Sequence, residues 1–177
     1  MNKEIRDKII THLSKQSGFI NEIKITSEKN KDGINLYYLK TTEFEKKERY
    51  GSKYINQAYY YAYDEEGNHV ATAFVYVTSP DTIEVDYKTE DEYMNKGNIT
   101  VLMKEVIREV FDDKVFDMLK TKENGDNTSI KKITLSINPY NLASQRVAEK
   151  LGFDDFGYLR LNDYNTMKSE NNKTSNY

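Results

Sequence analysis

The hydrophobic pattern of the chain changes its period once, and this change most constrains the fold. Ile83, Val85 and Tyr87 alternate with charged residues, which is the two-residue period of a half-buried strand over 82–88. From residue 99 onward the apolar residues recur at three- and four-residue spacing, which predicts an amphipathic helix. This helical stripe consists of Ile99, Leu102, Met103, Val106, Ile107, Val110 and Phe111. A strand followed by such a helix predicts an α/β (α+β) domain.

The residues before this change predict further strands and one helix. The expected elements are an N-terminal helix over residues 2–15, short strands over 19–26 and 34–40, and Tyr-rich or Val-rich strands over 57–63 and 69–78. Residues 41–55 have no clear period and are predicted to form a connection. Because polar turns separate the strands at 57–63, 69–78 and 82–88, these three predict an antiparallel meander.

The residues after the stripe predict three more elements. Val115, Phe116, Met118 and Leu119 are predicted to continue the helix after a break near Asp112. The later elements are a loop over 121–129, a strand over 131–137 closed by Pro139, a helix over 141–151 ended by Gly152, and a strand over 156–161. Residues 162–177 are polar with almost nothing to bury, so they are predicted to be disordered.

Composition excludes several classes of protein. The 177 residues suit one domain, and no apolar run approaches the roughly 20 residues that cross a bilayer. The N-terminus lacks the continuous apolar stretch of a secretion signal. The chain has no Cys and only two His, so we expect no metal centre. The net charge of -3 argues against binding of nucleic acid. These features predict a soluble cytoplasmic protein without a membrane or nucleic-acid partner.

One junction predicts an anion site. Residues 93–100 join a strand to the amphipathic helix through a short loop that contains Lys96 and Gly97. The first backbone N–H groups of a helix lack internal partners and carry partial positive charge, so they can hold a pyrophosphate. Most junctions of this kind bind nothing, and the motif alone leaves both interpretations open.

The C-terminal third resembles a known family. Residues 133–153 contain a strand, then Pro139-x-Asn141-x-x-Ser144, a helix with Arg146, and Glu149-Lys150-Leu151-Gly152-Phe153. This pattern is similar to the GCN5-related N-acetyltransferase (GNAT) superfamily, and resembles most its ribosomal-protein N-terminal acetyltransferase branch. Upstream, Glu84-Val85-Asp86-Tyr87, Glu92-Tyr93 and Lys96-Gly97 align without a gap. The resemblance covers residues 57–161, and the first fifty or so residues carry no motif that we can assign to a family.

The resemblance implies a fold and a cosubstrate. The expected GNAT fold has a mixed, mostly antiparallel sheet flanked by helices, in which the parallel strands at 82–88 and 131–137 splay apart around acetyl-CoA. Residues 57–161 would form the acetyl-CoA-binding core, and residues 1–56 the acceptor side. The implied cofactor-binding residues are Lys88, Asn95, Lys96, Gly97, Asn98, Ile99, Thr100, Asn141 and Arg146. The implied activity is direct transfer of an acetyl group to a primary amine, either a protein N-terminus or a small cationic amine.

The implied catalytic residues depart from the family's usual set. Many relatives place a Tyr on the last helix as the acid for the thiolate, and Ala148 stands at that position. Ser144 is the substitute candidate, although it also suits a plain role in capping the helix. Glu84 is the candidate general base, or else a solvent-facing strand residue. Ile99 and Asp86 replace small residues and could block the cleft. Ile99 and Ala148 favour a second hypothesis: a binding or regulatory module that kept the fold and lost the chemistry.

Two partner questions stay open at the level of sequence. Acidic residues gather at 81–92, and they either steer a cationic acceptor or are merely solvated. The oligomeric state is equally open, with a homodimer as one alternative.

Overall fold

The computed structural model describes residues 1–15, 19–20, 22–44, 55–117 and 129–175. The elements are α1 (Lys3–Leu13), β1 (Phe19–Ile20), β2 (Lys24–Lys29), β3 (Asn35–Phe44), β4 (Ile55–Tyr63), β5 (His69–Ser79), β6 (Thr82–Thr89), the 3₁₀ turn η1 (Asp91–Tyr93), α2 (Asn98–Phe111), β7 (Lys132–Leu135), α3 (Leu142–Leu151), β8 (Tyr158–Arg160) and α4 (Leu161–Ser175). The predicted change of period corresponds to the passage from β6 to α2.

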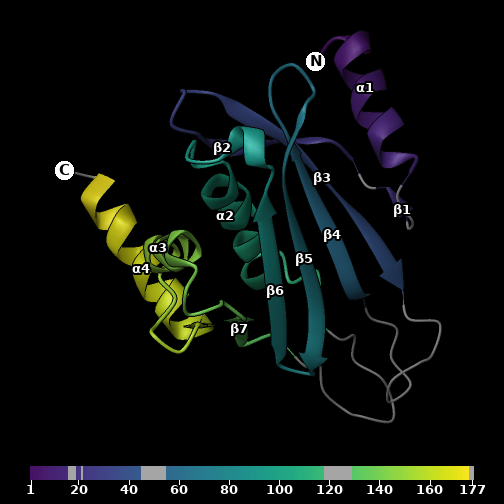
Figure 1. Ribbon diagram of the computed structural model, residues 1–177. Coiled ribbons are helices and arrows are strands. Elements are labelled where there is room, and N and C mark those ends of the chain that lie inside the picture. Colours follow the sequence, from purple (N-terminus) through teal and green to yellow (C-terminus); the bar gives the residue numbers. More distant parts are fainter. Residues whose placement is uncertain (16–18, 21, 45–54, 118–128, 176–177) are drawn as a thin grey trace.

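One mixed sheet organises the molecule (Figure 1). Its strands follow the order β1-β3-β4-β5-β6-β7-β8, and β2 also pairs with β3. Every pair is antiparallel except β6 and β7, which run parallel. The meander predicted from residues 57–88 is therefore confirmed as β4, β5 and β6. The mixed, mostly antiparallel sheet flanked by helices confirms the predicted fold class.

The parallel pair separates part-way along its length. β6 and β7 are in register from Thr82↔Lys132 to Val85↔Leu135. β7 ends at Leu135, whereas β6 continues to Thr89, so the last four residues of β6 have no strand partner on that side among the described residues. We call this point of divergence the fork. The fork confirms the splayed strands that the family resemblance implied.

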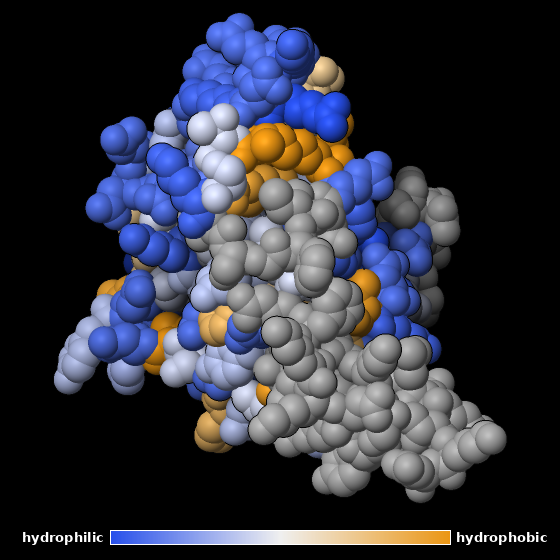
Figure 2. Space-filling view, turned by 90° about the vertical axis from the view of Figure 1, so that its right-hand side faces the viewer, coloured by the Kyte–Doolittle hydropathy of each residue, from blue (hydrophilic) through white to orange (hydrophobic). Residues whose placement is uncertain are grey.

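Helices cover both faces of the sheet. On one face, Ile9 and Leu13 of α1 pack on Leu39, Tyr61 and Tyr63. On the other face, α2 packs against the sheet and α3 packs against α2, and the main core lies there (Figure 1). Figure 2 views the side that carries α1, and its coloured surface is predominantly hydrophilic. The apolar stripe of α1 is therefore used against the sheet, as its spacing predicts. Among the described helices, none is long and apolar enough to cross a membrane.

Polar contacts attach the hairpin of β2 and β3 to α2. The backbone N–H of Ser27 donates to Glu105 Oε1 at 2.7 Å, and the ammonium of Lys104 pairs with Glu28 at 2.6 Å. Although burial raises the pKa of Glu105, hydrogen bonds from Ser27 and Arg108 outweigh it and hold this pKa below its usual value. The hairpin is consequently fixed beside the helix whose N-terminus borders the candidate site.

The described part of the chain corrects four of the predictions. α2 ends at Phe111, because the N–H groups of Asp112 and Asp113 both donate to the Arg108 carbonyl. Residues 112–117 therefore do not continue the helix. The predicted strand over 19–26 is instead two strands, β1 and β2, and β3 extends to Phe44 into the predicted connection. Residues 45–54, Met118, Leu119 and the predicted loop at 121–128 lie outside the described residues.

The C-terminal segment is the fourth correction. The predicted disorder of residues 162–177 is wrong for the segment up to Ser175, which forms α4. Tyr164 and Met167 pack against the main core, and the Tyr164 hydroxyl and the Lys168 ammonium bind Asp112 at 2.7 and 2.8 Å. α4 is stabilised by packing against α2 and α3, and the polar composition of the segment does not indicate this packing.

Candidate functional site

The loop before α2 presents unpaired backbone amides. Gly97 is the N-cap of α2 with φ 75°, a left-handed conformation that favours glycine, and no side chain caps this end of the helix. Val101 donates to the Gly97 carbonyl at 3.1 Å, but the N–H groups of residues 98–100 have no acceptor among the described residues. Asn95 also has a positive φ, 64°. Two left-handed residues followed by free amides form a concavity suited to an anion.

A cavity of about 390 Å³ lies between this loop, the end of β6 and the start of α3. Most of the predicted cofactor-binding residues line it, together with one of the two predicted catalytic residues: Lys88, Asn95, Gly97, Asn98, Ile99, Thr100, Asn141, Ser144 and Arg146. Lys96 and Glu84 do not line it. Segments far apart in the sequence therefore meet at one cavity, as the resemblance implied.

The start of α3 is held by hydrogen bonds that involve Asn141, Ser144 and Tyr87. Asn141 caps the helix, because its Oδ1 accepts from the Ser144 N–H at 3.1 Å. The Tyr87 hydroxyl donates to the Ser144 carbonyl at 2.8 Å and so links β6 to α3 across the cavity. Burial raises the pKa of Tyr87 to about 12, although a hydrogen bond with the Ser144 side chain partly opposes this shift, so the phenol stays protonated at neutral pH. The Ser144 hydroxyl therefore lies beside Tyr87, and Ser144 lines the cavity.

Asn98 and Ile99 border the cavity without filling it. The Asn98 side chain is buried, accepts from Asn30 Nδ2 at 2.9 Å and donates to the Tyr93 carbonyl at 3.3 Å. Its contribution to the site is therefore its backbone N–H. Ile99 is 6% exposed and belongs to the main core, so its branched side chain is accommodated away from the free amides. The cavity remains open despite this replacement of a small residue.

Lys96 turns away from the cavity. Its ammonium lies 3.4 Å from Asp32, and its carbonyl accepts from the Lys31 N–H at 2.8 Å. Lys31, which belongs to the turn between β2 and β3, lines the cavity instead. Lys96, which its position beside Gly97 predicted at the anion site, therefore does not line the cavity, whereas a lysine from a different element does.

Glu84 lies at the fork but on the opposite face of the sheet. It pairs in register with Thr134, one residue before the strands separate, and the alternation of β6 buries Ile83 and Val85 on the α2 side. A hydrogen bond from Tyr76 to Glu84 helps to raise the pKa of Tyr76 to about 12. Burial and the nearby Glu84 raise the pKa of Asp86, which is exposed on the same face as Glu84. Asp86 does not line the cavity, so this replacement does not block it either.

Comparison with known proteins gives the family. Residues 28–154 match the family model described as the acetyltransferase (GNAT) domain. The chain belongs to the GNAT acetyltransferase family. The matched range begins near the end of β2, includes β3, and ends before β8 and α4. It therefore extends the earlier resemblance toward the N-terminus, into a region that the motifs did not cover. A comparison with the curated proteins finds no match.

Solved structures of low sequence identity resemble this GNAT domain. The spermidine/spermine N-acetyltransferase of Vibrio cholerae is 15% identical with a TM-score of 0.49, over 63% of this chain and 70% of that one. The ribosomal-protein-S5-alanine acetyltransferase of Vibrio fischeri is 20% identical with a TM-score of 0.44, over 55% and 48%. A GNAT-family acetyltransferase of Bacillus anthracis is 18% identical with a TM-score of 0.44, over 54% and 51%. The chain spans about half the length of the last two structures.

Cations surround the cavity of this GNAT domain. Lys31, Lys88, Arg146 and Lys150 line it, and none of them has a carboxylate within 4.0 Å in the part of the chain that the structure describes. Sequence reasoning identified Lys88 and Arg146 but missed Lys31 and Lys150. The spacing of Arg146 and Lys150, four residues apart on one helix, was a signal that could have found the second of these. Nothing in the sequence indicated that the turn carrying Lys31 lies beside the cavity.

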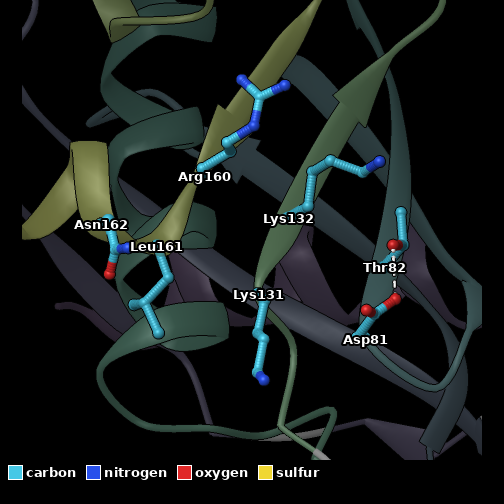
Figure 3. Close-up of a pocket in the computed structure, with 7 residues that line it drawn as sticks. All are labelled: Asp81, Thr82, Lys131, Lys132, Arg160, Leu161 and Asn162. Atoms are coloured by element: carbon cyan, nitrogen blue, oxygen red, sulfur yellow. Dashed lines mark hydrogen bonds between the residues drawn. The ribbon is translucent and has the colours of Figure 1, made fainter.

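A second cavity, of about 450 Å³, lies at the opposite end of β6 and β7 (Figure 3). Lys131, Lys132 and Arg160 line it, but the side chains of Lys131 and Lys132 point in opposite directions. Arg160 is paired with Asp154 at 2.9 Å, and Asp81 is hydrogen-bonded to Thr82. Because these cations do not converge on a common point, this cavity is a poorer anion site than the one at the fork.

Proposed function

We propose that this protein transfers an acetyl group from acetyl-CoA directly to a primary amine. The observation that carries the proposal is the cavity at the fork, where three unpaired amides at the N-terminus of α2 face four cations without carboxylate partners. A diphosphate has the charge and the acceptor atoms that such a surface lacks. Membership of the GNAT family supports this choice of ligand over other diphosphates.

The residues around the cavity fit acetyl-CoA in three respects. The N–H groups of residues 98–100 would hold the diphosphate, and Lys88 and Arg146 would neutralise it. The unpaired stretch of β6 beyond Val85 offers backbone groups to the amides of the pantetheine arm, beside the Asn141 side chain. The bound thioester supplies the acetyl group. The acceptor would be a protein N-terminus or a small cationic amine.

We assign the two proton transfers to Glu84 and Ser144. Attack on the thioester carbonyl forms a C–N bond and breaks the C–S bond, so the amine must lose a proton and the departing sulfur must gain one. Glu84, at the fork on the face away from α2, would accept the amine proton directly or through water. The Ser144 hydroxyl, which lies beside Tyr87 at the cavity, would donate toward sulfur and recover its proton from solvent.

Isothermal titration with acetyl-CoA tests the cofactor, and release of free thiol across a panel of amines tests the reaction. We expect saturable binding and amine-dependent thiol release. Gly97→Ala should weaken acetyl-CoA binding by about tenfold or more, because a Cβ strains the left-handed residue that aims the amides. Gly67→Ala, at φ 83° in the turn between β4 and β5, is the matched control that adds similar strain away from the cavity. An absence of heat at millimolar acetyl-CoA would refute the proposal.

A binding or regulatory module is the second candidate, and one observation favours it. Ala148, which is buried, occupies the position where many relatives have the acidic Tyr. This candidate predicts acetyl-CoA binding without thiol release from any amine, together with a saturable protein partner. The open cavity counts against a loss of ligand binding, because neither Ile99 nor Asp86 obstructs it.

A further inference from the structure

The cavity at the fork continues onto a shallower depression on the outer surface of α2. This depression has a volume of about 230 Å³ and shares four lining residues with the cavity: Lys31, Gly97, Thr100 and Lys150. A ligand whose diphosphate rests on the amides at residues 98–100 would pass this shared rim on its way out of the cavity. The charges of the residues at the rim therefore determine which chemical group of the ligand can be bound there.

Lys31 is fixed at the rim by contacts from its own turn. Its N–H donates to the Lys96 carbonyl at 2.8 Å, and the neighbouring Asn30 side chain donates to Asn98 at 2.9 Å. Its side chain lies along Gly97, with Cγ and Cε at 3.5 and 3.9 Å from where a Cβ of that residue would stand. The turn between β2 and β3 thus holds a lysine stem against the loop that presents the free amides.

The rim carries positive charge that the described part of the chain does not neutralise. Two nearby lysines are paired, Lys96 with Asp32 and Lys104 with Glu28. Neither Lys31 nor Lys150 has a carboxylate within 4.0 Å among the described residues. Asp91 lines the cavity, but it does not line the depression that shares Lys31 and Lys150. Two ammonium groups at one rim favour a doubly charged anion there.

We propose that Lys31 and Lys150 form a second phosphate site, which binds the ribose phosphate of coenzyme A and makes the protein discriminate against 3′-dephospho-coenzyme A. The inference rests on the proposed function, because it requires the diphosphate to occupy the amides of α2. A phosphate monoester carries close to two negative charges at pH 7, since its second pKa is about 6. Each ammonium can make a charge-assisted hydrogen bond to it.

Titration calorimetry with coenzyme A and 3′-dephospho-coenzyme A tests the second phosphate site without any acceptor amine. We expect the wild-type protein to bind coenzyme A about thirtyfold more tightly, allowing for partial solvent exposure of the lysines. Lys31→Met and Lys150→Met, which keep the apolar stems, should each lower the ratio of the two affinities to about fivefold, and the double variant to about twofold or less. Affinity for 3′-dephospho-coenzyme A should stay almost constant throughout the series.

Lys24→Met is the matched control, because Lys24 is an exposed lysine at the far end of the same hairpin, and it should leave the ratio unchanged. Thermal unfolding of each variant verifies that it is folded. Equal wild-type affinities for the two ligands would overturn the second phosphate site while leaving the proposed function intact, and so would a double variant that keeps the full preference. A wild-type protein that binds neither ligand would overturn both.

Discussion

At the scale of single residues, the proposed chemistry depends on one hydroxyl and one carboxylate. The Ser144 hydroxyl interacts with Tyr87, but the start of α3 is held through the Ser144 backbone, whose N–H donates to Asn141 and whose carbonyl accepts from Tyr87. Ser144→Ala should therefore preserve the start of α3 and the affinity for acetyl-CoA, while turnover with the best amine falls about a hundredfold. Glu84→Gln should have an effect of similar size. Thiol release measures turnover, and calorimetry measures affinity.

Ser79→Ala, at the far end of β5, is the control for removal of a serine hydroxyl and should leave turnover unchanged. Wild-type rates in both Ser144→Ala and Glu84→Gln would remove the two assignments. If Ser144→Ala weakens acetyl-CoA binding as much as turnover, the hydroxyl binds the ligand and is not the proton donor.

Part of the site could be predicted from the sequence because its motifs lie on contiguous elements. The loop at 95–100 and the start of α3 carry their own local signals, and both do line the cavity. Lys31 could not be predicted, because its place depends on the contact of Asn30 with Asn98, 68 residues away along the chain. The face of Glu84 was readable from the alternation of β6, which directs it away from Val85 and Tyr87.

At the scale of elements, α4 is the segment for which composition gave the wrong prediction, disorder instead of a helix. Its apolar residues, Leu161, Tyr164 and Met167, are too few to predict a helix. The Tyr164 ring lies 5.2 Å from the Phe111 ring, and Met167 packs beside Gly152, so the surface that stabilises α4 comes from α2 and the end of α3. Removal of residues 162–177 should therefore lower the free energy of unfolding by about 2–4 kcal/mol, as in other losses of buried large side chains.

Urea denaturation at fixed temperature measures the effect of this truncation. Met167→Ala should account for a substantial share of it, because Met167 packs against the main core. Lys168→Ala, which removes only a partly exposed ion pair with Asp112, should lower stability by less than about 1 kcal/mol. A truncated protein as stable as the full chain would mean that the segment contributes nothing, as its composition alone suggests.

At the scale of the whole molecule, one sheet couples two cores that share no residue. α1 and its cluster lie on one face, and α2 with the candidate site lies on the other, while β3 and β4 contribute residues to both. Adjacent residues of these strands point to opposite faces, so each of the two strands is stabilised by both cores. A change that weakens the α1 face should consequently appear in the global free energy of unfolding.

Acidification provides such a change, through two histidines between α1 and the sheet. The rings of His12 and His69 are stacked with centroids 4.6 Å apart, and His12 Nδ1 lies 2.7 Å from the Tyr63 hydroxyl. Burial lowers the pKa of both histidines below 6.5. The charge of Lys15 lowers the pKa of His12 further, and the charges of His12 and Lys88 lower that of His69. Glu90 partly opposes the shift in both. The unfolded chain therefore binds more protons just below pH 6.5, so stability should fall as the pH drops through 6.5 and level off below the folded pKa values.

Thermal melts between about pH 7.5 and pH 5.5 measure this dependence of stability on pH. The double variant His12→Phe/His69→Phe, which keeps two stacked rings, should flatten the profile over that range. A wild-type melting temperature that does not change across it would show that the two histidines are protonated without disturbing the attachment of α1.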